Sequence, residues 1–86
     1  MRQIIFTNHA IERLKERENR FTSIDDLKRL ASIAYDAEDV DDNLAPRLSR
    51  KLRKHSVPRN SLAKTAGGYI FIFTRSEPVL ITAYQA

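Results

Sequence analysis

Hydrophobic positions recur at helical spacing through the first half of the chain. Apolar residues at 10, 11 and 14 predict a helix over residues 9–17, with Thr7 or Asn8 as its N-cap. A longer stripe at 24, 27, 30, 31 and 34 predicts a second helix, capped by Thr22-Ser23. The acidic run 36–43 is expected to be a loop, because its like charges would repel along a helix.

Leucines at 44, 48 and 52 predict a third helix, which Asn43 would cap and which should stop before Pro58. Its opposite face is cationic. The cations on that face are Arg47, Arg50, Lys51 and Lys54.

The pattern then changes to that of strands. Residues 69–74 and 79–84 predict an antiparallel hairpin, residues 61–64 fit a short strand, and residues 1–6 fit either a short strand or an extended lead-in. Alternation puts three aromatics (69, 71 and 73) on one face and apolar residues 70 and 72 on the other, so one face should pack on helices while the other is partly covered or meets a partner. The expected fold is a single α+β domain, with about three helices followed by a two- to three-stranded antiparallel sheet.

Composition narrows the class of protein. The 86 residues contain no cysteine, which excludes disulfides and thiolate metal sites and fits a reducing compartment. No apolar run approaches the roughly 20 residues that span a bilayer, and the first residues do not resemble a signal peptide. We therefore expect a cytoplasmic protein.

Charge is segregated along the chain although the net charge is only +4. Residues 44–64 carry seven basic and no acidic side chains, whereas residues 21–43 carry two basic and seven acidic ones. The basic block is a candidate nucleic-acid surface. The alternative is that it docks on the acidic block of the same chain or of a neighbouring one.

The clearest chemical pattern is His9, Arg13 and Arg17, spaced four residues apart on the first helix. An imidazole beside two guanidinium groups suits a phosphate. In a metal-free ribonuclease reaction His9 could act as acid or base, Glu12 as base, and the two arginines could hold the phosphate. The alternative is structural: a His9 ring hydrogen-bonded to a carbonyl group or to Thr82, and arginines paired with Glu12, Glu16 or the acidic loop.

A second proton-transfer group would be Tyr84 or His55. No metal or cofactor is expected. The acidic run lacks the glycine and the later glutamate of a calcium loop, and the chain has no phosphate-binding glycine loop and no zinc-ligand spacing.

Residues 7–17 and 69–84 resemble the "HA-x-x-R-x-x-x-R" opening and the closing "I-T-x-Y" hairpin of small prophage proteins of the DUF4258-like group. The resemblance implies a fold like that of barnase- and RelE-type RNase toxins and, at second hand, metal-free RNA cleavage. By position, His9, Arg13, Arg17 and Thr82 match the recurring polar residues, and Tyr84 matches the terminal aromatic. The basic segment 44–59 is an insertion relative to the shorter members.

Three functions remain open at this point. The first is a toxin-like or prophage RNA-directed protein that acts as a metal-independent endoribonuclease. The second is a non-catalytic nucleic-acid-binding or phage accessory protein that uses the basic helix at 44–55. The third is an oligomeric module, or a module that binds a partner such as an antitoxin.

Overall fold

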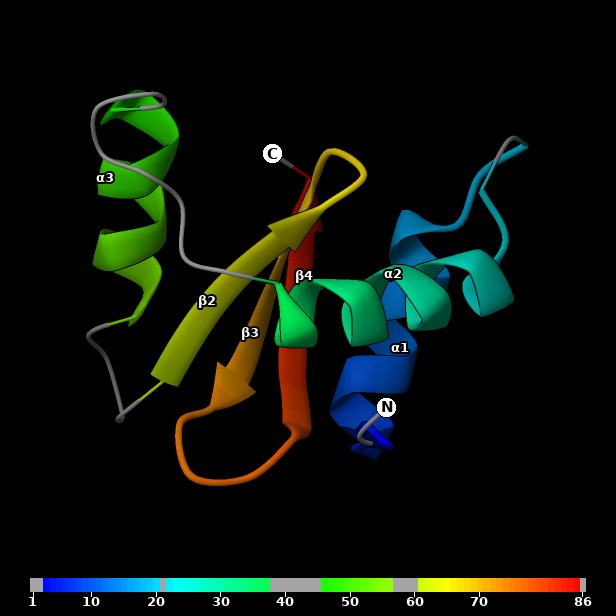
Figure 1. Ribbon diagram of the computed structural model, residues 1–86. Coiled ribbons are helices and arrows are strands. Elements are labelled where there is room, and N and C mark those ends of the chain that lie inside the picture. The colour runs from blue at the N-terminus through cyan, green and yellow to red at the C-terminus, as the bar shows by residue number, and fades with distance from the viewer. Residues whose placement is uncertain (1–2, 21, 38–45, 57–60, 86) are drawn as a thin grey trace.

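A computed structural model describes residues 3–20, 22–37, 46–56 and 61–85. The elements in these ranges appear in Figure 1. Their order is β1 (Ile5–Phe6), α1 (Asn8–Arg17), α2 (Ile24–Asp36), α3 (Pro46–Ser56), β2 (Ser61–Ala66), β3 (Tyr69–Thr74) and β4 (Val79–Gln85). The α+β prediction and its helices are confirmed. Most of the acidic run, the Asn43 cap and Pro58 lie outside the described residues.

The predicted sheet of two or three antiparallel strands is confirmed only in part: β2, β3 and β4 are antiparallel neighbours, but a further strand joins them. In the described part of the chain four strands form one sheet in the order β1-β4-β3-β2, and β1 runs parallel to β4. The parallel pairing joins Ile5 to Val79 and Phe6 to Leu80. Only the tertiary fold creates it, because the apolar lead-in must reach the last strand, more than 70 residues away, before it can pair.

Both helices at the start of the chain begin at side-chain caps. Thr7 accepts a hydrogen bond from the Ala10 amide at 3.0 Å, and Ser23 and Asp26 form a reciprocal capping box at the start of α2. These caps satisfy amide groups that have no partner within a helix. The starts of both helices are therefore fixed by local sequence, as predicted.

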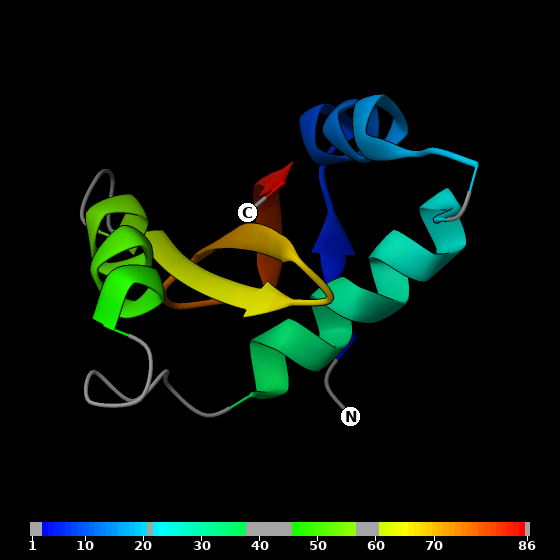
Figure 2. The ribbon, with the colours of Figure 1, turned by 90° about the horizontal axis from the view of Figure 1, so that it is seen from above.

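The sheet separates two hydrophobic clusters. On one face Phe71, Phe73 and Leu80 pack with Leu14 of α1 and Leu27 of α2. On the other face α3 covers β2 and β3, where a smaller cluster forms from Leu52, Ala63, Ile70 and Ile72. Figure 2 shows α3 across the sheet from α1 and α2. The expectation that one face of the hairpin packs on helices is confirmed, and α3 is what partly covers the other face.

Candidate functional site

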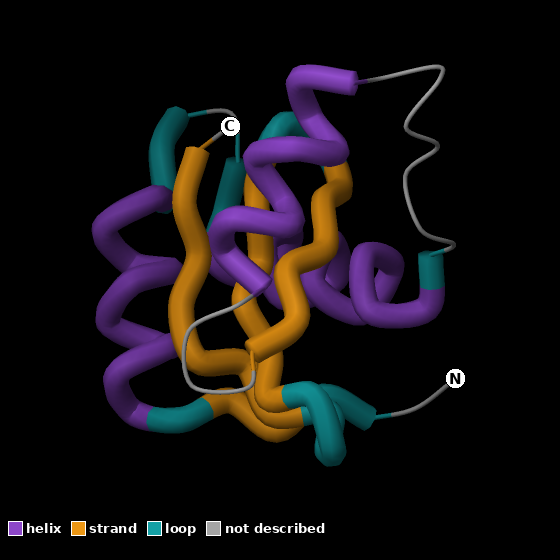
Figure 3. Tube along the Cα trace, turned by 90° about the vertical axis from the view of Figure 1, so that its left-hand side faces the viewer, coloured by secondary structure: helices purple, strands orange, loops and turns teal. Residues whose placement is uncertain are grey.

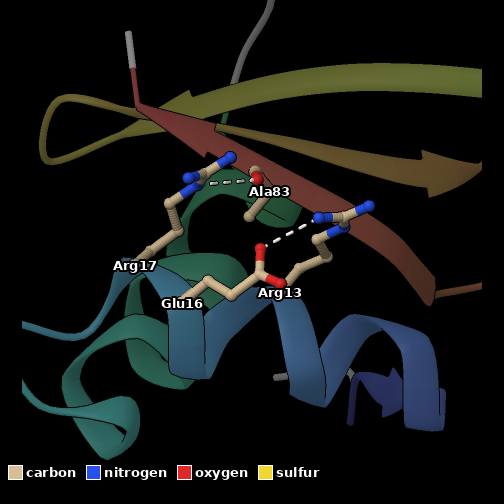
Figure 4. A network of polar contacts seen from close by, with 4 residues as sticks. All are labelled: Arg13, Glu16, Arg17 and Ala83. Carbon is tan, nitrogen blue, oxygen red and sulfur yellow. Dashed lines mark hydrogen bonds and ion pairs between the residues drawn. The ribbon is translucent and has the colours of Figure 1, made fainter.

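Helix α1 continues along the outer edge of β4 where β1 ends. Carbonyl groups along this edge accept a backbone amide of β1, the Thr7 hydroxyl and the Arg17 guanidinium. Figure 4 shows the last of these contacts, at Ala83. The bonds are Ile5 N to Pro78 O at 2.8 Å, Thr7 Oγ1 to Leu80 O at 3.3 Å and Arg17 Nε to Ala83 O at 3.4 Å. The side chains of Thr7 and Arg17 thus take the place of the backbone hydrogen bonds that a longer β1 would have made to β4.

The two arginines of the predicted phosphate clamp leave α1 on the side of β4, as Figure 4 shows. Arg13 Nη1 lies 2.9 Å from Glu16 Oε2, so Arg13 forms an ion pair at the protein surface. This is one of the structural pairings that the sequence left open. Arg17 instead lies half-buried at the strand edge, where its Nε–H donates a hydrogen bond to the Ala83 carbonyl. Each guanidinium has further N–H donors that do not take part in these contacts.

His9 and Glu12 have exposed side chains near the start of α1. His9 is eight residues from Arg17, which corresponds to about 12 Å along a helix axis. The imidazole therefore lies at one end of α1, and the Arg17 guanidinium lies at the other end. His9 and Glu12 share the first turns of α1 with Arg13. Arg17 is the last residue of α1, and its guanidinium lies near the end of β4.

Thr82 and Tyr84 lie on the sheet face on which α3 packs. Thr82 pairs with Ile72 and Tyr84 with Ile70, and paired residues of neighbouring antiparallel strands share a face. Thr82 is buried, whereas Tyr84 is 40% exposed. A hydrogen bond from His9 to Thr82, one of the alternatives from the sequence, does not fit this placement, because α1 packs on the other face.

Helix α3 does not cover the whole of its sheet face. Its contacts concentrate on β2, and Figure 3 shows β4 uncovered beside it, with α1 beyond. The β3–β4 register has an irregularity at Ile72/Phe73, which leaves Ile81 as an extra residue in β4. As a result Ile81 and Thr82 both lie on this face, within a mainly apolar set of residues that we call the β4 strip. The β4 strip consists of Ile5, Val79, Ile81, Thr82 and Tyr84.

The predicted cations of α3 all have exposed side chains. These are Arg47, Arg50, Lys51 and Lys54, and Arg53 is exposed as well. The helix is held on the sheet by buried Ser49 and Leu52 and half-buried Leu48. Arg53 was absent from the predicted set, although its place in the basic run was a sufficient signal. His55 lies in the last turn of α3.

The described residues contain no group of three or more histidine, aspartate and glutamate side chains that could hold a metal ion. None of the described helices combines the length and the apolarity needed to cross a bilayer. Comparison with protein-family models, curated proteins and solved structures found no match. The resemblance to the DUF4258-like group therefore stays a prediction.

Proposed function

We propose that this protein binds RNA, or another nucleic acid, through the cationic face of α3. The observation that carries the proposal is the exposure of five cations on one 11-residue helix that contains no acidic residue. Phosphate contacts supply most non-specific affinity for nucleic acids and require positive charge on an accessible surface. The apolar side of α3 packs on the sheet, so the charged side of the helix faces away from the sheet. The absence of cysteine supports a cytoplasmic location.

The test is the salt dependence of RNA binding. Replacing Arg50 and Lys51 by glutamine should weaken binding and should reduce the slope of log affinity against log salt by roughly 1–2. The matched control replaces Lys15 and Arg29, which are exposed on α1 and α2, and removes the same charge. An equal loss in both double variants, or binding that does not depend on salt, would contradict the proposal.

A second candidate function, metal-independent RNA cleavage, is supported by the exposure of His9 and Glu12 beside Arg13 on α1. In this reaction the RNA 2′-hydroxyl would attack phosphorus, with His9 or Glu12 taking up the proton. The other of these two residues would protonate the departing 5′-oxygen, because Tyr84 lies on the sheet face away from α1. Arg13 would leave Glu16 to contact the phosphate, whereas Arg17 would stay on the Ala83 carbonyl.

The test is RNA cleavage in the presence of EDTA. His9→Ala should reduce the cleavage rate by about a hundredfold or more while the melting temperature stays unchanged, because His9 is exposed. Intact RNA after incubation with the wild-type protein would leave the binding function alone. Cleavage that EDTA abolishes would point to a metal-dependent contaminant or a different mechanism.

The third candidate is self-association or the binding of a protein partner such as an antitoxin. The exposed cations of α3 and the acidic block of the sequence are charge-complementary between copies. Light scattering should then show a dimer or a larger species that high salt dissociates. A monomer at high protein concentration in low salt would exclude self-association.

A further inference from the structure

The β4 strip is the second unusual surface of this protein. The exposed large apolar side chains among the described residues are Ile5, Ile33 and Tyr84. Ile5 and Tyr84, at 55% and 40% exposure, both belong to the β4 strip, whereas Ile33 lies alone on α2. Val79 and Ile81 are half-buried between them. Since Thr82 is buried, the accessible part of the strip is apolar and has an aromatic residue near one end.

Positive charge flanks the β4 strip on two sides. On one side lies α3 (Figure 3), whose arginine and lysine side chains are exposed. On the other side Arg17 reaches the strand edge at Ala83, between Thr82 and Tyr84 in the sequence (Figure 4). A protein partner with an apolar surface would not require cations on both sides. A single-stranded nucleic acid has both chemistries, since its bases are flat and apolar on their faces and its backbone is anionic.

We propose that the β4 strip receives the bases of single-stranded RNA, with one base stacked on Tyr84, while the RNA backbone lies on the cations of α3. This inference rests on the proposed RNA-binding function and adds to it a preference for single-stranded over duplex RNA. The bases of a duplex are stacked on one another and cannot reach a sheet surface, so duplex RNA would contact the cations alone. The protein should therefore prefer single strands.

The experiment measures binding of three labelled ligands of equal length by fluorescence anisotropy. The ligands are single-stranded oligoadenylate, an RNA duplex, and an abasic strand that keeps the phosphates. Wild-type protein should bind oligoadenylate most tightly. Tyr84→Ala should weaken that binding about tenfold and should leave the other two ligands within twofold. Tyr84→Phe, which keeps the ring, should bind all three as the wild type does.

Two controls separate stacking from loss of structure and from general apolarity. Ile33→Ala removes an exposed apolar side chain elsewhere and should change nothing. If Tyr84→Ala melts at a lower temperature than the assay allows, Ile5→Ser replaces it, because Ile5 is more exposed and should reduce oligoadenylate binding severalfold. Far-UV circular dichroism of each variant gives the folded fraction.

The outcomes distinguish this inference from the function on which it rests. If Tyr84→Ala binds oligoadenylate like the wild type, or loses all three ligands equally, the stacking platform is wrong while RNA binding through α3 stands. If the wild type binds none of the ligands, both fail. If light scattering shows a dimer that Tyr84→Ala dissociates, the strip is an interface between copies and the inference is overturned.

Discussion

At the residue scale, Thr7 shows how one side chain can join local and tertiary structure. Its hydroxyl accepts from the Ala10 amide, which begins α1, and donates to the Leu80 carbonyl, which lies 73 residues away. A hydroxyl group can do both, because it has one donor and two acceptor positions. Thr7 therefore begins the helix and fixes the start of that helix to β4.

We expect Thr7→Val to lower the free energy of unfolding by about 1–2 kcal/mol, since it keeps the shape of the side chain and removes both hydrogen bonds. Thr7→Ser should cost less than half as much, because the hydroxyl remains. Urea denaturation of the three proteins measures the difference. Equal costs for Val and Ser would show that the methyl group, and not the hydroxyl, supplies the stability.

Asp26 adds a contribution that depends on pH. The Ser23 backbone amide, at 3.1 Å from Oδ2, and then the Ser23 side chain hold the pKa of Asp26 below its ordinary value. A carboxylate with a lowered pKa stabilises the folded state above its unfolded pKa of about 4, and this stability is lost as the pH falls through the folded pKa.

Asp26→Asn should therefore reduce stability at pH 7 and should also reduce the loss of stability between about pH 4 and more acidic conditions. Asp25→Asn is the matched control, because Asp25 is exposed in the same helical turn and is not part of the capping box. The measurement is the urea midpoint as a function of pH. Parallel curves for wild type and Asp26→Asn would contradict the assignment.

At the element scale, the turn between β2 and β3 depends on two glycines that are not equivalent. Gly67 and Gly68 have φ angles of +57° and +82°, in the region that other residues rarely adopt. A Cβ atom on Gly67 would lie 2.9 Å from both methyl carbons of Leu30, whereas a Cβ atom on Gly68 would meet nothing within 4 Å. The turn is therefore also a contact with α2.

Gly68→Ala should cost about 1 kcal/mol for the strained backbone alone, and Gly67→Ala should cost more, because Leu30 must move as well. In a Leu30→Ala background the extra cost at Gly67 should disappear, while the cost at Gly68 should not change. Thermal or urea unfolding of this mutant cycle measures both terms. An unchanged cost at Gly67 would mean that Leu30 gives way freely.

At the scale of the whole molecule, the sheet has a larger cluster on the side of α1 and α2 and a smaller one under α3. Leu14 is fully buried in the larger cluster, and Leu52 retains 8% exposure in the smaller one. Substitutions on the two sides should therefore have different consequences for the cooperativity of unfolding.

Leu14→Ala should lower global stability by about 3 kcal/mol, because it leaves a cavity in the main core. Leu52→Ala should cost less and should mainly loosen α3, so that its amides exchange faster than those of β3. Hydrogen exchange followed by residue distinguishes the two. Uniform acceleration in Leu52→Ala would show that α3 and the main core unfold as one unit.

Local pattern was sufficient for most of the elements and for part of the candidate site. The caps at Thr7 and Ser23 and the helix periodicity are short-range features, and the structure contains all of them. The cations of α3 could be assigned to an exposed face for the same reason: leucine spacing identifies the opposite face. By contrast, residues 61–66 form a longer strand than was predicted, since pairing with β3 extends it.

The sequence by itself determined where the helices and the hairpin strands lie and which side of α3 is charged, because those features depend on neighbours within a few residues. Only the tertiary structure decided that β1 pairs with β4, that Arg17 binds the edge of β4, and that α3 leaves the β4 strip open. Each of these joins distant segments. No local pattern can encode such a contact, because its energy exists only after the chain has folded.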